Sequence, residues 1–524
     1  MRKFNVTGNC IPSENYMVDI SGKIAQIKKL IDNGYYFTIN RARQYGKTTT
    51  LGVLEHAIRD EYIVASISFQ AIGEESFKSV EEFCEMFTEL VHEALQFAKT
   101  EENYAEQWLD KNLTSFRLLS RHITKMCKDK KIVLMIDEVD NTSDNRVFIQ
   151  FLNTLREKYI ARRNGKDYTF YSVILAGVYD IKNIKLKMQK EGVHVPSETE
   201  NKLYNSPWNI AANFTVDMSF NPAEIASMLA EYENDRKTGM KITPISEEIY
   251  NFTSGYPFLV SRICQCIDEE LNKNWTVDGV QGAVQILLAE KNMLFDDLLK
   301  NLENNSDLYD LIYDVLITGT QRTFTFGNPT IDMGYMYGII KNDRRFNRAA
   351  VSNKIYEIIL ADYFISKDEA SKNKKPANVL PRDVAQNGRF DMELCLLKFA
   401  GHYSEIFNEN DEKFLERHGR LIFLSYLRPL INGQGFYHIE SQFTDLRRMD
   451  IVVDYGSDQF IIELKVWNGE KYNREAYGQL LGYMETKKAN IGYLLTFDFR
   501  KDKNKQPKAE WLDFDGKRIF DVLI

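Results

Sequence analysis

The sequence lacks an excess of basic residues, since its 524 residues carry a net charge of -8 at pH 7. A protein that holds nucleic acid through a uniformly basic surface is therefore excluded, and any nucleic-acid contact must use a local patch. The composition is otherwise that of a globular protein, with 44% hydrophobic and 27% charged residues. Disorder is not expected for such a chain.

Cysteines and long apolar runs are scarce too. Six cysteines with one close pair, Cys264 and Cys266, make neither a disulfide framework nor a zinc knuckle, which favours reduced thiols in a cytoplasm. The seven histidines do not pair at metal-ligand spacing, so each is expected to be a core or surface residue. Nowhere do about 18 apolar residues run together, and the start offers no signal peptide. We expect a soluble cytoplasmic protein with no membrane partner.

A chain of this length should divide into about two to four domains. Residues 1–225 alternate strand-like runs with amphipathic helical stretches. This pattern predicts an α/β domain with a parallel sheet and helices on both faces. The expected strands are residues 35–40, 62–70, 131–140, 171–180 and 213–220.

The rest of the chain divides into four parts. Residues 226–303 are predicted to form a helical lid, and residues 304–368 give helices around a turn-rich piece, an order compatible with a winged helix. The polar residues 369–384 are typical of a linker. Residues 385–524 give a helical segment, three strands, a helix and a strand, which predicts a second α/β domain.

A phosphate-binding loop (P-loop) is predicted between the first strand and the next helix. Loop amides and the helix N-terminus can hold phosphate oxygens, Lys47 can reach the terminal phosphates, and the Thr48 hydroxyl can ligate magnesium. Gly46 lets the backbone come close. The general motif has glycine where this chain has Arg41, and the alternative is a plain helix cap at Thr48 or Thr49. The residues assigned to nucleotide binding here are Arg41, Ala42, Arg43, Gln44, Tyr45, Gly46, Lys47, Thr48 and Thr49.

A second motif supports nucleotide binding. The apolar run over residues 132–136 is followed by Asp137 and Glu138, so two acids stand at the carboxyl end of a buried parallel strand. Asp137 can hold the magnesium shell, and Glu138 can polarise the water that attacks ATP. Capping of the next helix is the alternative for Asp140 and Asn141.

These motifs make about the first 265 residues resemble the AAA-ATPase-like family of bacterial proteins, close to the archaeal-type STAND ATPases. The resemblance rests on the stretches NYMVDIS, YYFTINRARQYGKTTTL, IVLMIDEVD, VILAGVYDIKNIK, SPWNIAANFTVDMSF and TSGYPFLVSRIC. It implies that arginine at the first loop position, here Arg41, is a family trait. It also implies that Arg262 touches the γ-phosphate, although an arginine on a packed helix is the alternative. Asp180 takes the place of a sensor residue, with a plain turn aspartate as the alternative.

Charged residues also interrupt two apolar strands near the C-terminus. Side chains alternate faces along a strand, so Glu463 and Lys465 point the same way, and a hairpin can bring Asp450 beside them. Two neighbouring carboxylates resist joint ionisation unless a divalent cation shares them. The set fits metal-assisted phosphodiester hydrolysis. The alternative is a structural salt bridge on a solvated sheet edge, which the flanking apolar residues disfavour.

The order of these elements, with Asp450, Glu463, Lys465 and then Gln479, resembles the RecB-like branch of the PD-(D/E)XK nuclease superfamily over about residues 385–524. The resemblance implies that Asp450 and Glu463 bind Mg²⁺ or Mn²⁺ and that Lys465 is catalytic. It further implies that Gln479 orients the substrate or the lysine.

Two further positions follow from the same resemblance. Glu416 matches the helical acid that joins the metal ligands, with Glu412 as a near competitor, and Tyr483 shares the orienting role. The proline that names the superfamily is absent, because Met449 precedes the first acid.

The motifs together lead to the hypothesis of an enzyme that binds and hydrolyses ATP and cleaves DNA or RNA under nucleotide control. ATP and Mg²⁺ are the expected cofactors, with Mn²⁺ as a substitute at the nuclease site. The alternative is a nucleotide-controlled switch or scaffold whose nuclease fold is not catalytic. Either version is compatible with a homo-oligomer or a partner protein.

Overall fold

The chain forms two units, and each is described by itself. The first comprises Met1–Tyr250, Gly255–Trp275 and Met336–Gly338, and the second comprises Asn251–Ser254, Thr276–Tyr335 and Ile339–Ile524. The computed structural model describes residues 2–70, 72–97, 102–142, 146–178, 208–318, 320–372, 381–386, 388–406, 416–441, 449–467, 469–498 and 507–524.

A four-stranded parallel sheet forms the centre of the first unit, in the order β1-β4-β3-β2. Its strands are β1 (Tyr36–Asn40), β2 (Ile63–Ser68), β3 (Ile132–Asp137) and β4 (Ser172–Gly177). These strands are rich in apolar residues because both faces of the sheet are covered. In β3, for example, Ile132 and Leu134 belong to one core cluster, while Val133 and Met135 belong to the other.

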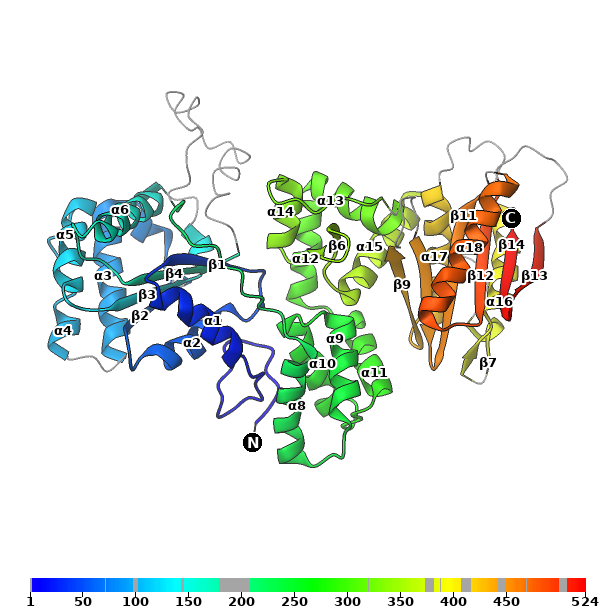
Figure 1. Cartoon of the computed structure of the whole chain (residues 1–524), viewed down its shortest axis with the longest axis horizontal. Coiled ribbons are helices and arrows are strands. Elements are labelled where there is room, and N and C mark those ends of the chain that lie inside the picture. Colours follow the sequence, from blue (N-terminus) through cyan, green and yellow to red (C-terminus); the bar gives the residue numbers. More distant parts are fainter. Residues whose placement is uncertain are drawn as a thin grey trace, which may run out of the picture. The chain divides into compact units, whose positions relative to one another are not determined.

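Helices cover both faces of this sheet (Figure 1). α3, α5 and α6 pack on one core cluster, and α1 and α2 pack on the opposite one. The helices around the sheet are α1 (Ser21–Asp32), α2 (Lys47–Ile58), η1 (Glu74–Phe77), α3 (Val80–Phe97), α4 (Glu102–Glu106), α5 (Phe116–Cys127), η2 (Val139–Thr142) and α6 (Arg146–Arg163). The predicted α/β fold with a parallel sheet and helices on both faces is confirmed.

The fifth predicted strand, residues 213–220, is wrong. No strand forms over these described residues, and pairing with β1 is limited to a bridge between Phe37 and Ala212. The Arg41 guanidinium instead donates to the Val216 carbonyl at 2.9 Å. Val216 is buried as irregular chain, and an apolar run alone does not distinguish a strand from a buried connection.

The predicted lid is helical. Its helices are α8 (Pro222–Arg236), α9 (Ile242–Thr253), α10 (Pro257–Glu269), α11 (Val277–Ala289) and α12 (Met293–Glu303). A capping box starts α8, since the Asn221 side chain accepts from the Glu224 N–H and the Glu224 side chain accepts from the Asn221 N–H. α8 and α10 belong to the first unit and α11 and α12 to the second. The division into lid, winged helix and linker stays a prediction.

The second unit continues with helices and a short hairpin. Its elements are α13 (Ser306–Tyr313), the π-helical η5 (Asp314–Thr318), α14 (Pro329–Met336), β5 (Ile340–Asp343), β6 (Arg348–Val351) and α15 (Lys354–Lys372). β5 and β6 pair antiparallel, and Thr323 bridges to Arg348 beside them.

A mixed six-stranded sheet forms the C-terminal domain, in the order β13-β14-β12-β11-β10-β9. Its elements are η6 (Pro381–Asp383), β7 (Ala385–Gln386), β8 (Arg389–Phe390), α16 (Met392–Ile406), α17 (Glu416–Ile431), β9 (Gly435–Ser441), β10 (Met449–Tyr455), β11 (Asp458–Val466), α18 (Glu470–Lys487), β12 (Ile491–Phe497), β13 (Lys508–Phe514) and β14 (Lys517–Leu523). The predicted second α/β domain is confirmed, although β13 and β14 were not expected. None of the described helices is both long and apolar enough to cross a bilayer.

The segment before α8 packs closely against Gly255 at the start of α10, and a substitution of this glycine tests that packing. It has φ +74°, and a Cβ there would lie 1.8 Å from the Phe220 carbonyl oxygen. Gly239 has φ +78° with nothing within 4 Å, so it shares only the left-handed strain of about 1–2 kcal/mol. Gly255→Ala should therefore lower the thermal unfolding midpoint more than Gly239→Ala. Equal midpoints in scanning calorimetry would contradict this packing.

Candidate functional sites

The loop between β1 and α2 has the geometry of a phosphate-binding turn. Gln44 and Gly46 have φ values of 55° and 74°, which turn successive backbone amides toward one side. Lys47 begins α2 and is only 6% exposed. Its ammonium donates to the Arg41 and Ala42 carbonyls at 2.9 and 3.0 Å. The lysine ammonium therefore lies against its own loop, where a phosphate could replace the two carbonyls as its hydrogen-bond acceptor.

The two predicted magnesium ligands are in direct contact at the carboxyl edge of the sheet. Thr48 Oγ1 donates to Asp137 Oδ2 at 2.6 Å. Glu138 has φ 56°, a costly conformation for a non-glycine residue, and its N–H donates to Asp137 Oδ1 at 2.9 Å. Burial raises the pKa of Glu138, and burial lowers the pKa of Lys47 against the opposing effect of the nearby acids. The ammonium, hydroxyl and carboxylates suit a phosphate with a divalent cation.

Asp140 contacts the end of β4, and the alternative that it caps the next helix stays a prediction. It lies in η2, and its Oδ2 accepts the Val178 N–H at 2.5 Å. A Cβ on Gly177 would come within 2.7 Å of Asp140 Oδ1. Asp140 thus ties the end of β3 to the end of β4, and the glycine that ends β4 was the only sequence signal for this contact.

Other residues assigned to nucleotide binding point elsewhere. The Arg41 guanidinium donates to the Asn40 and Val216 carbonyls at 2.8 and 2.9 Å. Thr49 Oγ1 accepts the Cys10 N–H at 3.3 Å. These two side chains therefore hold the loop to its surroundings.

Arg262 lies on α10, where its guanidinium pairs with Glu270 at 2.8 Å and donates to Gln265 at 3.0 Å. These contacts keep it among residues of its own helix and of the turn that follows. Its contact with a γ-phosphate stays a prediction. Asp180 lies outside the described residues.

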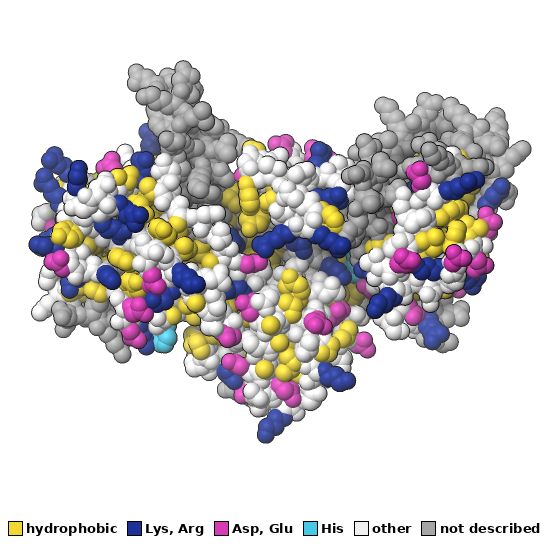
Figure 2. All heavy atoms as spheres, in the orientation of Figure 1, with side chains coloured by type: hydrophobic (Ala, Val, Ile, Leu, Met, Phe, Trp, Pro, Cys, Tyr) yellow, Lys and Arg dark blue, Asp and Glu magenta, His cyan; other side chains and the backbone are white. Residues whose placement is uncertain are grey.

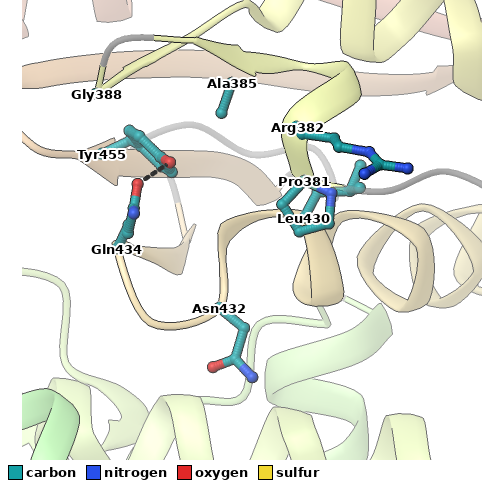
Figure 3. Close-up of a pocket in the computed structure, with 8 residues that line it drawn as sticks. All are labelled: Pro381, Arg382, Ala385, Gly388, Leu430, Asn432, Gln434 and Tyr455. Atoms are coloured by element: carbon teal, nitrogen blue, oxygen red, sulfur yellow. Dashed lines mark hydrogen bonds between the residues drawn. The ribbon is translucent and has the colours of Figure 1, made fainter.

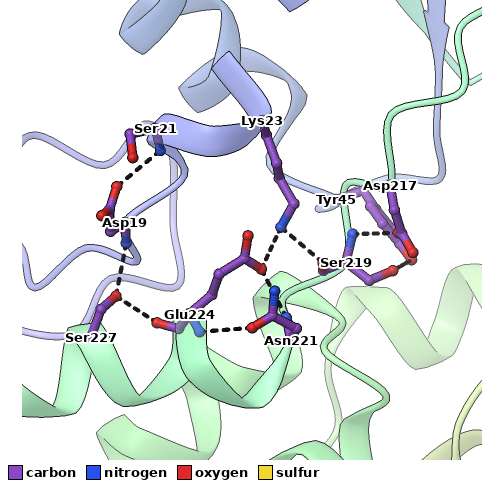
Figure 4. Close-up of polar contacts among 9 residues, drawn as sticks. All are labelled: Asp19, Ser21, Lys23, Tyr45, Asp217, Ser219, Asn221, Glu224 and Ser227. Atoms are coloured by element: carbon purple, nitrogen blue, oxygen red, sulfur yellow. Dashed lines mark hydrogen bonds and ion pairs between the residues drawn. The ribbon is translucent and has the colours of Figure 1, made fainter. Parts of the chain in front are cut away.

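A polar network joins the phosphate-binding loop to the lid (Figure 4). The Tyr45 and Ser219 hydroxyls are 2.7 Å apart. Lys23 of α1 donates to the Ser219 carbonyl at 2.9 Å and pairs with Glu224 of α8 at 2.5 Å. The Tyr45 ring also packs edge-on against Tyr256, which precedes α10. The loop is thereby connected to the starts of both α8 and α10.

The second candidate site lies on the C-terminal sheet, where the strand register brings the predicted residues together. Asp450 and Glu463 are directly opposite in the antiparallel pair β10–β11, so both belong to one face. Lys465 follows on the same face and forms an ion pair with Glu463, and both side chains are 2% exposed. The Asp450 side chain itself lies outside the described part of the chain.

α18 closes this face of the sheet. The packed side chains are Ala476, Leu480, Tyr483 and Met484 of α18 with Val452, Ile461, Leu494 and Ile519 of the strands. Beside them, Gln479 Oε1 is buried without a hydrogen-bond partner among the described residues, and so is Thr496 Oγ1. Thr496 pairs in register with Lys465, a neighbour that only the parallel pairing reveals. Buried oxygens left without partners are costly, so this set fits a site completed by a cation or substrate.

Glu416 begins α17, but its side chain lies outside the described part, as does all of Glu412. One turn further, Arg420 is 2% exposed and donates to the Ile317 carbonyl of η5. The helix that carries Glu416 is thus anchored to the elements before α14. The helical-acid role of Glu416 stays a prediction.

His438 is a core residue, as expected. It is 3% exposed, and its Nε2 lies 2.5 Å from Asp454 Oδ2. Burial alone would raise the pKa of Asp454, but hydrogen bonds from His438 and Gln459 hold it below its ordinary value.

A cavity of about 270 Å³ opens beyond this pair, at the end of β10 opposite to Asp450 (Figure 3). Arg382 lines it, and the Tyr455 hydroxyl donates to Gln434 there. It is separate from the face that carries Glu463 and Lys465.

Comparison with known families agrees with both halves of this description. Residues 11–324 match the family described as AAA-like domain, and residues 436–508 match the PD-(D/E)XK nuclease superfamily. No curated protein matches the sequence. The two resemblances drawn from the motifs are confirmed.

Several solved structures of archaeal proteins are similar to this chain. A Walker-type ATPase of Pyrococcus abyssi is 11% identical with a TM-score of 0.46, over 68% of this chain and 99% of that one. The Aeropyrum pernix ORC1 protein in complex with DNA is 10% identical with a TM-score of 0.30, over 67% and 94%. The ORC2 protein of the same organism is 12% identical with a TM-score of 0.35, over 70% and 98%. Scores this low leave the fold assignment to the family matches.

Lys47 and Arg41 should differ in their effect on nucleotide affinity. Lys47→Ala should weaken ATP binding about tenfold or more, because a hydrogen bond to a charged group is worth about 1.5–3 kcal/mol. Arg41→Ala should change the affinity less than about threefold, since its guanidinium contacts backbone carbonyls. Calorimetric titration with Mg²⁺ and a non-hydrolysable ATP analogue measures both, and equal losses would refute the distinction.

Proposed function

Because the chain belongs to the AAA-like domain family over residues 11–324 and carries a PD-(D/E)XK nuclease domain near its C-terminus, we propose that it binds and hydrolyses ATP and cleaves DNA or RNA under nucleotide control. The observation that carries the nuclease half is the register that sets Asp450, Glu463 and Lys465 on one sheet face. All six cysteines are free thiols, which supports a cytoplasmic setting; the bacterial source rests on the family resemblance.

At the ATPase site, the loop amides and Lys47 take the phosphates, while Thr48 and Asp137 take the magnesium. The magnesium supplies charge neutralisation at the phosphates when bound. Glu138 is the base that orients the attacking water, and its strained backbone beside Asp137 supports that role.

At the nuclease site, Asp450 and Glu463 hold Mg²⁺ or Mn²⁺, with Glu416 as the further acid. A bound metal supplies a water of lowered pKa and neutralises charge on the scissile phosphate. Lys465 forms an ion pair with Glu463. If Glu463 held the metal, the Lys465 ammonium would be free to contact the phosphate. The Gln479 oxygen, which has no partner within the described part of the chain, is then a hydrogen-bond acceptor for that lysine.

Contacts of Tyr45 in the phosphate-binding loop support the proposed nucleotide control. Tyr45 contacts Ser219 and Tyr256, so a rearrangement of the loop around a phosphate reaches the starts of α8 and α10. These contacts support control that passes through the lid.

The alternative, a switch or scaffold with a non-catalytic nuclease fold, is favoured by one observation. The buried pair of Glu463 and Lys465 is also what a purely structural ion pair looks like. Metal binding separates the two functions, because a structural pair needs no metal.

Cleavage by the full-length protein tests the proposal. With Mg²⁺ or Mn²⁺ it should cut at least one member of a panel of DNA and RNA substrates, at a rate that differs with and without ATP. Lys465→Ala should lower the rate about a hundredfold or more, the usual cost of losing a group that stabilises transition-state charge. Lys508→Ala, which removes an exposed charge from β13, is the matched control. Unchanged cleavage by Lys465→Ala, or no cleavage by the wild type, would refute the nuclease.

A further inference from the structure

An exposed aromatic cluster lies before and on α14 in the second unit. The ring centroids of Phe324, Phe326 and Tyr335 are 5.0, 5.6 and 5.8 Å apart and lie nearly edge to face. Phe326 is 68% exposed and Tyr335 is 36% exposed, whereas Phe324 is 3% exposed and anchors the cluster. Adjacent exposed rings of this kind mark an interaction surface.

Three arginines lie on the neighbouring β5–β6 hairpin. Arg344 and Arg345 are exposed at its tip, and Arg345 and Arg348 lie over the Phe346 ring at 5.3 and 5.1 Å. Asp343 is the one acid between residues 340 and 351. The hairpin is therefore a local basic patch on a chain of net charge -8. Figure 2 shows Lys and Arg side chains gathered across the middle of the face, where Figure 1 draws β6.

Backbone hydrogen bonds join the aromatic cluster to the hairpin. The Phe324 N–H donates to the Asn347 carbonyl at 2.9 Å, and the Ala349 N–H donates to the Arg322 carbonyl at 2.8 Å. The segment that carries Phe324 therefore lies beside the hairpin that carries the arginines. We refer to Phe324, Phe326, Tyr335, Arg344, Arg345 and Arg348 together as the aromatic–arginine surface.

We propose that the aromatic–arginine surface binds single-stranded nucleic acid. Exposed rings stack on unpaired bases, whereas the bases of a duplex are already stacked on each other, and arginine forks hold phosphates. An acidic protein segment would satisfy the arginines but would leave the rings without a role. The inference rests on the proposed function, because it names the class of strand that the nuclease domain receives.

Within the second unit, the nuclease domain contacts elements that flank this surface. Arg420 of α17 donates to the Ile317 carbonyl of η5. Asp362 of α15 accepts the Tyr437 hydroxyl of β9 at 2.8 Å and pairs with Arg428 of α17 at 3.0 Å. A strand held at the surface is thereby kept at a set place relative to the nuclease sheet.

Fluorescence anisotropy of the full-length protein in EDTA, without metal, tests the inference. A labelled strand of about 20 nucleotides should bind at least tenfold more tightly than its duplex. The double variant Phe326→Ala, Tyr335→Ala should weaken strand binding about tenfold or more through lost stacking. The triple variant Arg344→Ala, Arg345→Ala, Arg348→Ala should reduce the slope of log affinity against log salt by about 2.

Matched controls remove the same groups elsewhere. The variant Lys291→Ala, Lys300→Ala, Lys508→Ala removes three exposed charges from the second unit, and Phe97→Ala removes a ring that is 88% exposed. Both should bind the strand like the wild type, and all variants should unfold at the same temperature.

Equal affinity for strand and duplex, or strand affinity unchanged in the aromatic variant, would overturn the inference. Strand binding without cleavage in metal would leave this surface standing and refute only the nuclease. Cleavage with no effect of the surface variants on binding would refute only the surface.

Discussion

The buried ion pair of Glu463 and Lys465 is the constraint on which the C-terminal domain depends. Each charge costs several kcal/mol to remove from water, and a well-packed apolar pair would serve stability as well. The register places Asp450 opposite the glutamate and Thr496 beside the lysine. α18 covers the face and brings the Gln479 oxygen, which is buried without a partner among the residues that the structure describes. A bound cation would pair with the buried carboxylates, and a bound phosphate would pair with the buried lysine. Such ligands would offset the cost of burying these charged and polar groups together.

The N-terminal site follows the same logic. Lys47 donates to carbonyls of its own loop, and Thr48 donates to Asp137. A phosphate would replace the carbonyls as the partner of Lys47, and a magnesium ion would replace the hydrogen bond between Thr48 and Asp137. Few polar groups would lose a partner in this exchange, so its cost in free energy would be small. Under the proposed nucleotide control, the Tyr45 contact with Ser219 would pass such an exchange on to the start of α8. In the structure, both candidate sites therefore have their charged groups paired with internal partners.

The sequence predicted those parts of the fold that depend on local pattern. β3 is apolar and ends at Asp137 as expected, and Glu463 and Lys465 share a face because strands alternate. The failures involve non-local contacts or weak patterns. Residues 213–220 are not a strand. The Val216 carbonyl accepts a hydrogen bond from the Arg41 side chain in place of one from a neighbouring strand. β13 was missed because it is exposed along most of its length and shows no apolar alternation. The place of Thr496 beside Lys465 depends on parallel pairing, which no local pattern specifies.

Calorimetric titration of Mn²⁺ into nucleotide-free protein tests the central claim most directly. The Asp137→Asn background removes the predicted magnesium-binding carboxylate of the ATPase site, so that saturable Mn²⁺ binding reports mainly on the nuclease face. The account predicts saturable Mn²⁺ binding that is lost when Asp450→Asn is added and when Glu463→Gln is added. Absence of saturable binding, or binding unchanged by both substitutions, would contradict it and leave the buried pair as a structural ion pair.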